Sequence, residues 1–273
     1  MAEAGFPRSL SVSRVNDFLT CPLLYRFRTI DRLPEAPAPA AIMGTLVHSA
    51  LEDLFALPAA QRTDQAAAEL FDKAWSRLQE EDESSATAVA DRIETSATLL
   101  ASYFALEDPT RLAPHALEMG FETALTDDFA IRGYIDRVDV APDGRIRIVD
   151  YKTGKAPSAA FQDKAMFQMK FYALAWWRLH GTIPAMLQLL YLGNTRMLRL
   201  EPTESELLAT ERKVLAVRES IALAARTENF TATPSRLCDW CDHQALCPAK
   251  GGTPPPIPPQ DLWLERSPIT KRS

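Results

Sequence analysis

Three consecutive stretches that favour β-strands, at 114–125, 129–140 and 145–152, constrain the fold of this chain more than any other feature. Their residues suit extended structure, and successive side chains along a strand point to opposite faces. A Pro-Asp-Gly sequence at 142–144 is a turn signal between the second and third stretches. The sequence therefore predicts a meander of three strands in the middle of the chain.

Helical periodicity flanks these strands on both sides. Apolar residues recur at three- and four-residue steps upstream, and we expect helices at 41–57, 62–81 and 86–107, after two shorter helices within 9–32. Downstream we expect a strongly apolar helix at 160–180, strands at 185–192 and 196–201 around Gly193-Asn194, and an amphipathic helix at 203–227. This order predicts an α/β fold with a core sheet flanked by helices.

The composition suits an ordinary globular protein. The chain has 273 residues, 47% of them hydrophobic and 24% charged, which suits one large domain or a domain with an appended subdomain. No apolar run approaches the roughly 20 residues of a membrane span, and residues 1–8 lack the layout of a secretory signal. We therefore expect a cytoplasmic protein without a membrane partner. With a net charge of −6, DNA binding would need a local basic groove, for which Arg14, Arg26 and Arg28 are candidates.

The stretch at 145–152 carries the strongest signal of chemistry. Asp150 and Lys152 share one face of this strand, and the preceding strand adds Asp136. Two carboxylates held close repel each other unless a cation compensates them, and their oxygens suit a hard divalent ion such as Mg²⁺ or Mn²⁺. Lys152 beside such an ion can orient a water or stabilise negative charge on a phosphate. The pattern predicts phosphodiester hydrolysis, and a surface hairpin with ordinary salt bridges is the alternative.

Three polar residues in apolar helical stretches add to this signal. His48 follows Gly44 by one turn and is a candidate third metal ligand, unless it is a structural histidine. Gln168 and Tyr172 are four residues apart on one face of the strongly apolar helix. A buried amide must find partners, so Gln168 is expected to reach Lys152 or a substrate phosphate. The alternative is that both groups only satisfy nearby backbone groups.

The chain contains four cysteines, Cys21, Cys238, Cys241 and Cys247. Disulfides are not expected in the cytosol, and three thiols within ten residues indicate a metal or cluster site. The C-x2-C-x5-C spacing with one distant thiol suits structural Zn²⁺ or an iron–sulfur cluster, and His243 could replace a cysteine at zinc. Either group would tie the N-terminal helix to the C-terminal segment.

Together and in this order, the motifs resemble those of the RecB-like PD-(D/E)XK nucleases. The resemblance extends from Leu10 to Pro248 and rests on Gly44 to His48, Asp136, Asp150-Tyr151-Lys152 and Gln168-x3-Tyr172. The split cysteine set resembles that of the AddB nuclease domain and of CRISPR-adaptation nucleases. The resemblance implies a restriction-endonuclease-like core sheet flanked by helices, with an N-terminal helical region and a cysteine-cluster clasp that joins the two ends.

The resemblance also implies a role for each motif. His48, Asp136, Asp150 and the backbone carbonyl of Tyr151 would bind a catalytic Mg²⁺ or Mn²⁺, and Lys152 would activate the attacking water. Gln168 and Tyr172 would organise Lys152 and the scissile strand, so the expected catalytic residues are Asp136, Asp150, Lys152, Gln168 and Tyr172. Cys21, Cys238, Cys241 and Cys247 would hold a structural 4Fe–4S cluster. Glu118 and Glu122 are expected only as secondary acidic contributors.

The expected function is that of a metal-dependent DNA exonuclease acting on single strands or DNA ends in repair or recombination. No Gly-x4-Gly-Lys-Ser/Thr loop is present, so translocation along DNA would need a helicase or another repair protein as partner. A non-catalytic module that binds DNA ends or a partner is the main alternative, and a zinc-stapled enzyme acting on RNA is a third reading. We expect an N-terminal helical region at 1–110, a nuclease core at 111–230, a cluster segment at 231–250 and a proline-rich tail at 251–273.

Overall fold

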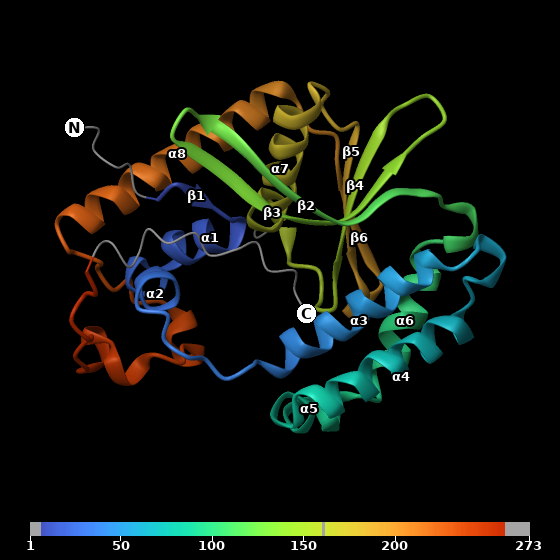
Figure 1. The fold of residues 1–273 in the computed structure, drawn as a ribbon, viewed down its shortest axis with the longest axis horizontal. Coiled ribbons are helices and arrows are strands. Elements are labelled where there is room, and N and C mark those ends of the chain that lie inside the picture. The colour runs from blue at the N-terminus through green and yellow to red at the C-terminus, as the bar shows by residue number, and fades with distance from the viewer. Residues whose placement is uncertain (1–6, 160–161, 260–273) are drawn as a thin grey trace. The chain divides into compact units, whose positions relative to one another are not determined.

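The computed structural model describes residues 7–159 and 162–259, drawn as a coloured ribbon in Figure 1. These residues form two compact units. Unit 1 comprises 7–36, 121–133 and 208–259, and unit 2 comprises the described residues in 37–120 and 134–207. Both units are discontinuous in sequence, because strands in the middle of the chain contribute to each.

A mixed sheet forms the centre of unit 2. Its strands follow the order β3 (Phe129–Val140), β4 (Ile146–Lys152), β5 (Met186–Tyr191) and β6 (Arg196–Leu200), and β2 (Pro114–Thr126) pairs with β3. β3 and β4 are antiparallel, β4 and β5 are parallel, and β5 and β6 are antiparallel. The α/β class and the five strands expected from the sequence are confirmed.

Two turns of this sheet depend on glycine for different reasons. The turn at 142–144 joins β3 to β4 as predicted, with Gly144 in the left-handed region at φ 84°. In the turn between β5 and β6, the left-handed residue is Thr195, at φ 49°, directly after the expected turn residues Gly193-Asn194. Gly193 is needed because a Cβ atom there would lie 2.7 Å from the main chain of Gly154. The segment after β4 thus approaches this turn too closely for a side chain.

Helices cover the face of the sheet that carries Val149 and Tyr151 (Figure 1). They are α3 (Pro39–Ala56), α4 (Asp64–Glu81), α5 (Glu83–Val89) and α6 (Thr95–Leu106). Their apolar side chains form one core cluster with these two strand residues and with Leu190 of β5. Burial of this apolar surface is the main contribution to the stability of unit 2.

The prediction of a single helix at 86–107 is wrong. A 3-10 turn at Ala90–Arg92 separates α5 from α6, and neither glycine nor proline marks the break in the sequence. The change of direction allows both Val89 and Leu99 to enter the same core cluster. Tertiary packing therefore overrides a local pattern that favours one continuous helix.

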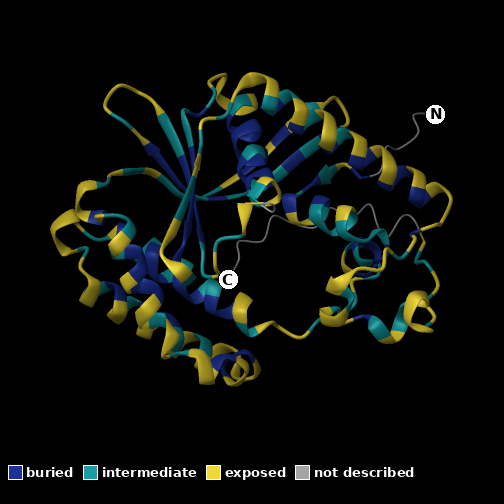
Figure 2. Ribbon diagram, turned by 180° about the vertical axis from the view of Figure 1, so that it is seen from behind, coloured by how far each residue is buried: buried dark blue, intermediate teal, exposed yellow. Residues whose placement is uncertain are grey.

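The strongly apolar helix, α7 (Gln162–His180), contacts β4 and β5. Gln168 of this helix donates a hydrogen bond to Asp150 of β4. Because neighbouring residues of a strand alternate faces, α7 lies on the face of the sheet opposite to Val149 and Tyr151. Figure 2 shows the inner strands and much of this helix as buried. The predicted helix is confirmed from Gln162, and residues 160–161 lie outside the described part of the chain.

Unit 1 contains both ends of the described chain. β1 (Ser9–Leu10) pairs in parallel with the first half of β3 and leads into α1 (Val12–Thr20), where the Ser11 hydroxyl caps the helix by accepting from the N–H of Arg14. α2 (Pro22–Tyr25), a π-helix at Arg26–Ile30 and most of α8 (Glu204–Arg226) also belong to this unit. The cysteine segment consists of short 3-10 turns at Arg236–Trp240, Gln244–Leu246 and Pro248–Lys250.

The first part of the predicted proline-rich tail packs onto the N-terminal helices. Residues 252–259 have neither helix nor strand, but the guanidinium of Arg26 donates to the carbonyl of Pro255. Residues 260–273 of that tail lie outside the described residues, as do residues 1–6. Among the helices that the structure describes, none is long and apolar enough to cross a membrane.

Candidate active site

The strand pair β3–β4 places the two predicted catalytic carboxylates opposite each other. The antiparallel register pairs Arg137 with Val149, and one further step pairs Asp136 with Asp150. Both carboxylates therefore project from the same face of the sheet. Asp150 is almost completely buried, with 1% of its surface exposed. A hairpin with solvated surface charges, the alternative considered from the sequence, does not bury a carboxylate in this way.

His48 on α3, Glu118 on β2 and Asp136 on β3 converge on one point. One ligand atom from each lies within 4.8 Å of the others, which identifies them as a possible metal-binding group within the described residues. The Nδ1 atom of His48 lies 3.4 Å from Asp136 Oδ2 and 3.9 Å from Glu118 Oε1. Glu118 has a φ of 42° inside its strand, a conformation that costs a non-glycine residue roughly 1–3 kcal/mol. This strained backbone directs its carboxylate towards the other two groups.

The second ring nitrogen of His48 fixes the direction of the first. Nε2 lies 2.9 Å from the carbonyl oxygen of Tyr151, and since a carbonyl only accepts, Nε2 carries the proton in the neutral ring. The lone pair of Nδ1 then points towards the carboxylates of Glu118 and Asp136. Three electron-pair donors directed at one another suit a cation between them.

Asp150 is bound to a second set of side chains. Lys152 Nζ lies 2.6 Å from Asp150 Oδ2, and Gln168 Nε2 donates to Asp150 Oδ1 at 2.8 Å. Gln168 also accepts from Lys152 at 3.1 Å and donates to the Tyr172 hydroxyl at 2.8 Å. The structure thus brings the predicted residues of β4 and α7 together, and Gln168 is connected to all three of the others.

Burial and charge perturb Asp136 strongly. Desolvation is the largest cause that raises the pKa of Asp136, to about 7, and repulsion by Asp150 adds to it. His48, Lys152 and the N–H of Tyr151 act in the opposite direction. Without a cation, this carboxyl therefore holds its proton to a higher pH than an ordinary aspartate. A divalent ion would compensate both carboxylates and displace the proton.

These residues are named the acidic site, which comprises His48, Glu118, Asp136, Asp150, Lys152, Gln168, Tyr172 and the main chain of Tyr151. Their carboxylate and imidazole ligands fit a divalent cation. The sequence placed Glu118 only among secondary contributors, and the pairing of its strand with β3 shows why its part is larger. Glu122, considered with it, is exposed.

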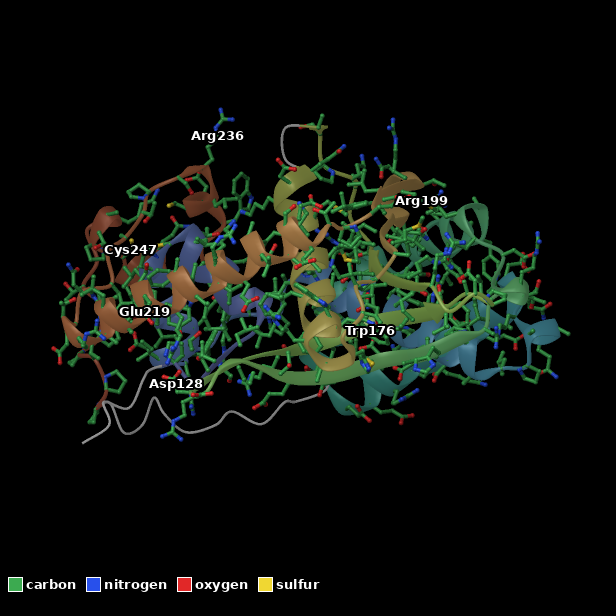
Figure 3. All side chains as sticks on the ribbon, turned by 90° about the horizontal axis from the view of Figure 1, so that it is seen from above. Asp128, Trp176, Arg199, Glu219, Arg236 and Cys247 are labelled. Carbon is green, nitrogen blue, oxygen red and sulfur yellow. The ribbon has the colours of Figure 1, made fainter. Side chains whose placement is uncertain are left out.

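The four cysteines of unit 1 line one cavity of about 220 Å³, named the cysteine cavity. Each thiol-bearing residue is partly buried, and Figure 3 labels Cys247 in this segment. The main-chain N–H of Thr233 points at the sulfur of Cys21 at 3.4 Å, and that of Ser235 points at the sulfur of Cys238 at 3.3 Å. These N–H groups would stabilise thiolates in the cavity.

The spacing of the four sulfurs bears on what the cavity can hold. No three of them lie within 4.8 Å of one another, in contrast to the group at His48. Four thiolates at about 2.3 Å from one Zn²⁺ would be separated by only about 3.8 Å. A four-iron cluster binds each thiolate at a different iron and so holds the sulfurs further apart. Zinc would therefore require the sulfurs to move inward.

His243, considered from the sequence as a replacement ligand for zinc, is engaged elsewhere. It is 4% exposed, and its Nε2 lies 2.7 Å from Glu35 Oε1 while its ring packs on Phe27. It is absent from the residues that line the cysteine cavity. Glu35 also accepts from Arg28, whose guanidinium bonds Asp17 at 2.6 Å. His243 therefore connects the cysteine segment to the N-terminal segment within unit 1, and Arg28 holds its partner Glu35 in place.

Arg26, another arginine expected to contact DNA, is paired with a carboxylate, as Arg28 is. It lies 3.0 Å from Asp31 and is 6% exposed. Arg14 differs from Arg26 and Arg28 in having other arginines near it. Burial is the largest cause that lowers the pKa of Arg14, and repulsion by Arg132 and Arg32 lowers it further. The guanidiniums of Arg14, Arg32 and Arg132 are thus near enough to interact electrostatically, and all three residues are at least partly accessible.

Comparison with known proteins identifies the family and one curated relative. The model of the PD-(D/E)XK nuclease superfamily matches residues 9–248. The Gene 69 protein of Mycobacterium phage D29 is 28% identical over 196 residues, which are 60% of this chain and 67% of that protein. The crystal structure of SSO0001 covers 89% of this chain and 87% of its own, with a TM-score of 0.41 and 15% identity.

Proposed function

The chain belongs to the PD-(D/E)XK nuclease superfamily, and from this membership we propose that it is a divalent-metal-dependent DNA exonuclease. The observation that carries the proposal is the acidic site, where Asp136 lies opposite Asp150 and Lys152 lies beside it. The superfamily implies a metal-dependent nuclease with DNA as its substrate. Beyond this, we propose that single-stranded DNA or DNA ends are cut, in repair or recombination.

The metal site is proposed to comprise His48, Asp136, Asp150 and the carbonyl of Tyr151, as the resemblance implied. The convergence of His48, Glu118 and Asp136 supports adding Glu118 to this set. When bound, a divalent cation supplies Lewis-acid polarisation of the scissile phosphate and of the attacking water. Asp136 must release its proton for this, and its raised pKa makes that release dependent on the cation.

Lys152 is proposed to orient the attacking water and to stabilise negative charge on the phosphate. Its ammonium is fixed between Asp150 and Gln168, yet 33% of its side chain is exposed and so accessible to a substrate. Gln168 and Tyr172 are proposed to hold Lys152 and the scissile strand. A charge that is already in place when the reaction begins stabilises the transition state without a reorganisation cost.

For the cysteine cavity we propose a structural 4Fe–4S cluster, which would place the protein in the RecB-like branch of the superfamily. Two observations support a cluster: the shared cavity and the N–H groups directed at two of the sulfurs. Anaerobic purification tests this, because a cluster colours the protein brown and zinc leaves it colourless. In this proposal Cys21, Cys238, Cys241 and Cys247 close a clasp within unit 1.

A DNA substrate and a net charge of −6 require a local basic surface. Arg14, with Arg32 and Arg132 near it, is proposed to contribute to that surface. A helicase or another repair protein is proposed as partner, in a cytoplasmic setting. We likewise propose that the chain is divided into functional regions. They are a helical region at 1–110, a nuclease core at 111–230, a cluster segment at 231–250 and a tail at 251–273.

End-labelled single-stranded DNA with Mn²⁺ or Mg²⁺ tests the proposed activity. The wild-type protein should degrade it, and Asp150→Asn, which removes one charge at a buried position, should not. Asp143→Asn is the matched control, because Asp143 is an exposed turn residue paired only with Arg145 within the described residues. DNA binding without degradation by a folded wild-type protein would favour the non-catalytic DNA-end-binding module instead.

A further inference from the structure

Tyr151 lies between two residues of the acidic site but points away from it. Asp150 and Lys152 face α7, whereas the side chain of Tyr151 is 4% exposed and belongs to the core cluster beneath α3 to α6. Its main chain nevertheless contacts the site on both sides. Its N–H donates to Asp136 Oδ2 at 2.9 Å, and its carbonyl lies 2.9 Å from His48 Nε2. The placement of this one residue therefore affects two of the proposed metal ligands directly.

The hydroxyl of Tyr151 is held by Arg137. Nη1 of Arg137 donates to it at 2.5 Å, and the guanidinium also lies over the Tyr151 ring, 5.6 Å from its centroid. Arg137 is 0% exposed, so the contact is shielded from solvent on every side. A charge-assisted hydrogen bond in such a place is stronger and more directional than one at a surface.

Carboxylates hold Arg137 itself in place. Its Nη2 lies 2.7 Å from Glu107 Oε2, and its Nε lies 3.1 Å from Asp139 Oδ1. Arg147 bonds the same two carboxylates, at 3.3 Å and 2.7 Å. Two guanidiniums and two carboxylates balance, so this network adds no net charge behind the acidic site. We therefore expect its effect on the site to act mainly through geometry.

The bonds close a ring across β3 and β4. Asp136 is joined to Arg137 by the chain, Arg137 holds the Tyr151 side chain, and the Tyr151 N–H returns to Asp136. Such a ring restrains the carboxylate of Asp136 and the carbonyl of Tyr151 relative to each other. Without it, Asp136 would have to find its position against the repulsion of Asp150.

We propose that Arg137 and the Tyr151 hydroxyl are positioning groups, which hold the Asp136 carboxylate and the Tyr151 carbonyl at the spacing that a divalent cation requires. This inference rests on the proposed function, in that the acidic site binds such a cation. It assigns a purpose to the buried ion network on the far face of the sheet. Neither group is proposed to touch substrate.

Calorimetric titration of the DNA-free protein with Mn²⁺ tests this role. Tyr151→Phe removes only the hydroxyl and should weaken Mn²⁺ binding about tenfold, the lower end of what removing a group that orients a metal ligand costs. The Mn²⁺ concentration for half-maximal cleavage should rise in parallel. The matched control is Tyr25→Phe: it removes the hydroxyl of another buried tyrosine, which belongs to unit 1 and whose hydroxyl has no hydrogen-bond partner among the described residues.

Arg137→Lys provides a second variant should Tyr151→Phe fail to fold. Lysine keeps the charge near Glu107 but cannot hold both carboxylates and the hydroxyl at once, so the same tenfold weakening is expected. Mn²⁺ affinity equal to that of the wild type in the folded variants would overturn the inference alone. A wild-type protein that neither binds Mn²⁺ nor cleaves DNA would instead overturn the proposed function.

Discussion

The acidic site and the cysteine cavity contain similar numbers of potential ligands, but the polypeptide prepares them in different ways. In the acidic site, regular strands and helices carry the groups, and hydrogen bonds connect nearly every member to another, as with Gln168 and its three partners. In the cysteine cavity, three thiols lie on or beside short 3-10 turns, Cys21 lies between α1 and α2, and all four line a cavity of about 220 Å³. The groups of the acidic site are thus held by hydrogen bonds to one another, whereas the cysteines surround a cavity.

This difference indicates what each bound group would contribute. A cation at the acidic site would mainly relieve charge, because Asp136 and Asp150 are already held in place and repel each other. A cluster in the cysteine cavity would mainly supply connections, because few side-chain bonds tie that segment down. Loss of the first should therefore affect chemistry, and loss of the second should affect stability.

Lys152→Ala should give the largest effect and should leave the fold intact. Removing a charge that stabilises the transition state lowers cleavage by about 10³-fold, or about 4 kcal/mol, while DNA binding and Tm stay close to the wild-type values. Lys170→Ala is the matched control, since Lys170 pairs with Glu206 at 2.9 Å away from the acidic site. Quantitative product ladders measure the loss, and wild-type cleavage by Lys152→Ala would remove Lys152 from the mechanism.

Cys21→Ser should show the opposite pattern. It removes the one thiol that comes from the N-terminal segment, so we expect loss of cluster absorbance and a destabilisation of more than about 3 kcal/mol. For a chain of this size that lowers Tm by at least about 6 °C.

Mn²⁺ affinity at the acidic site should change little in the same variant, because that site is built within unit 2. Leu19→Ser is the control, as it introduces the same residue at an exposed position two residues away. If Cys21→Ser retained both the Tm and the visible spectrum of the wild type, the cavity would have no structural ligand.

The two sites also differ in how far the sequence could predict them. Alternation along β4 was enough to place Asp150 and Lys152 on one face, and the hairpin turn at 142–144 made Asp136 their neighbour. The part of Glu118 was underestimated, because its orientation depends on a positive φ inside a strand that no local pattern announces. Arg137 was missed for a related reason, since its partners Glu107 and Tyr151 are brought to it only by the tertiary fold.

Gly193→Ala should have a smaller effect, through the scaffold of the acidic site. A Cβ atom there would lie 2.7 Å from main-chain atoms of Thr153 and Gly154, directly after Lys152. The backbone must shift, at a cost of about 1–3 kcal/mol, and cleavage should fall because Lys152 moves with it. Gly154→Ala alters the other side of the same contact, where an added Cβ atom meets nothing within 4 Å. Equal stability of the two variants in urea titrations would contradict this account.

The smallest expected effect is the pH dependence of metal binding at the acidic site. The pKa of Asp136 is raised to about 7, by burial first and by Asp150 second, so below pH 7 a cation must displace a proton. The apparent Kd for Mn²⁺ should be about tenfold higher at pH 6 than its limit at high pH. In the metal-free protein the same shift stabilises the protonated fold, so stability should decline as pH rises from about 4 to about 7.

Calorimetry in two buffers of different ionisation enthalpy counts the protons released. Because the pKa of Asp136 is raised, more protons should leave per Mn²⁺ at pH 6 than at pH 8. Binding at the cysteine cavity should depend on pH differently. Burial raises the pKa of the Cys241 thiol, so a ligand that binds its thiolate must displace a proton at neutral pH. A proton count at the acidic site that did not change between pH 6 and pH 8 would mean that Asp136 is already ionised. The cation would then not contribute by compensating the charge of Asp136. The two sites would differ only in the geometry of their ligands.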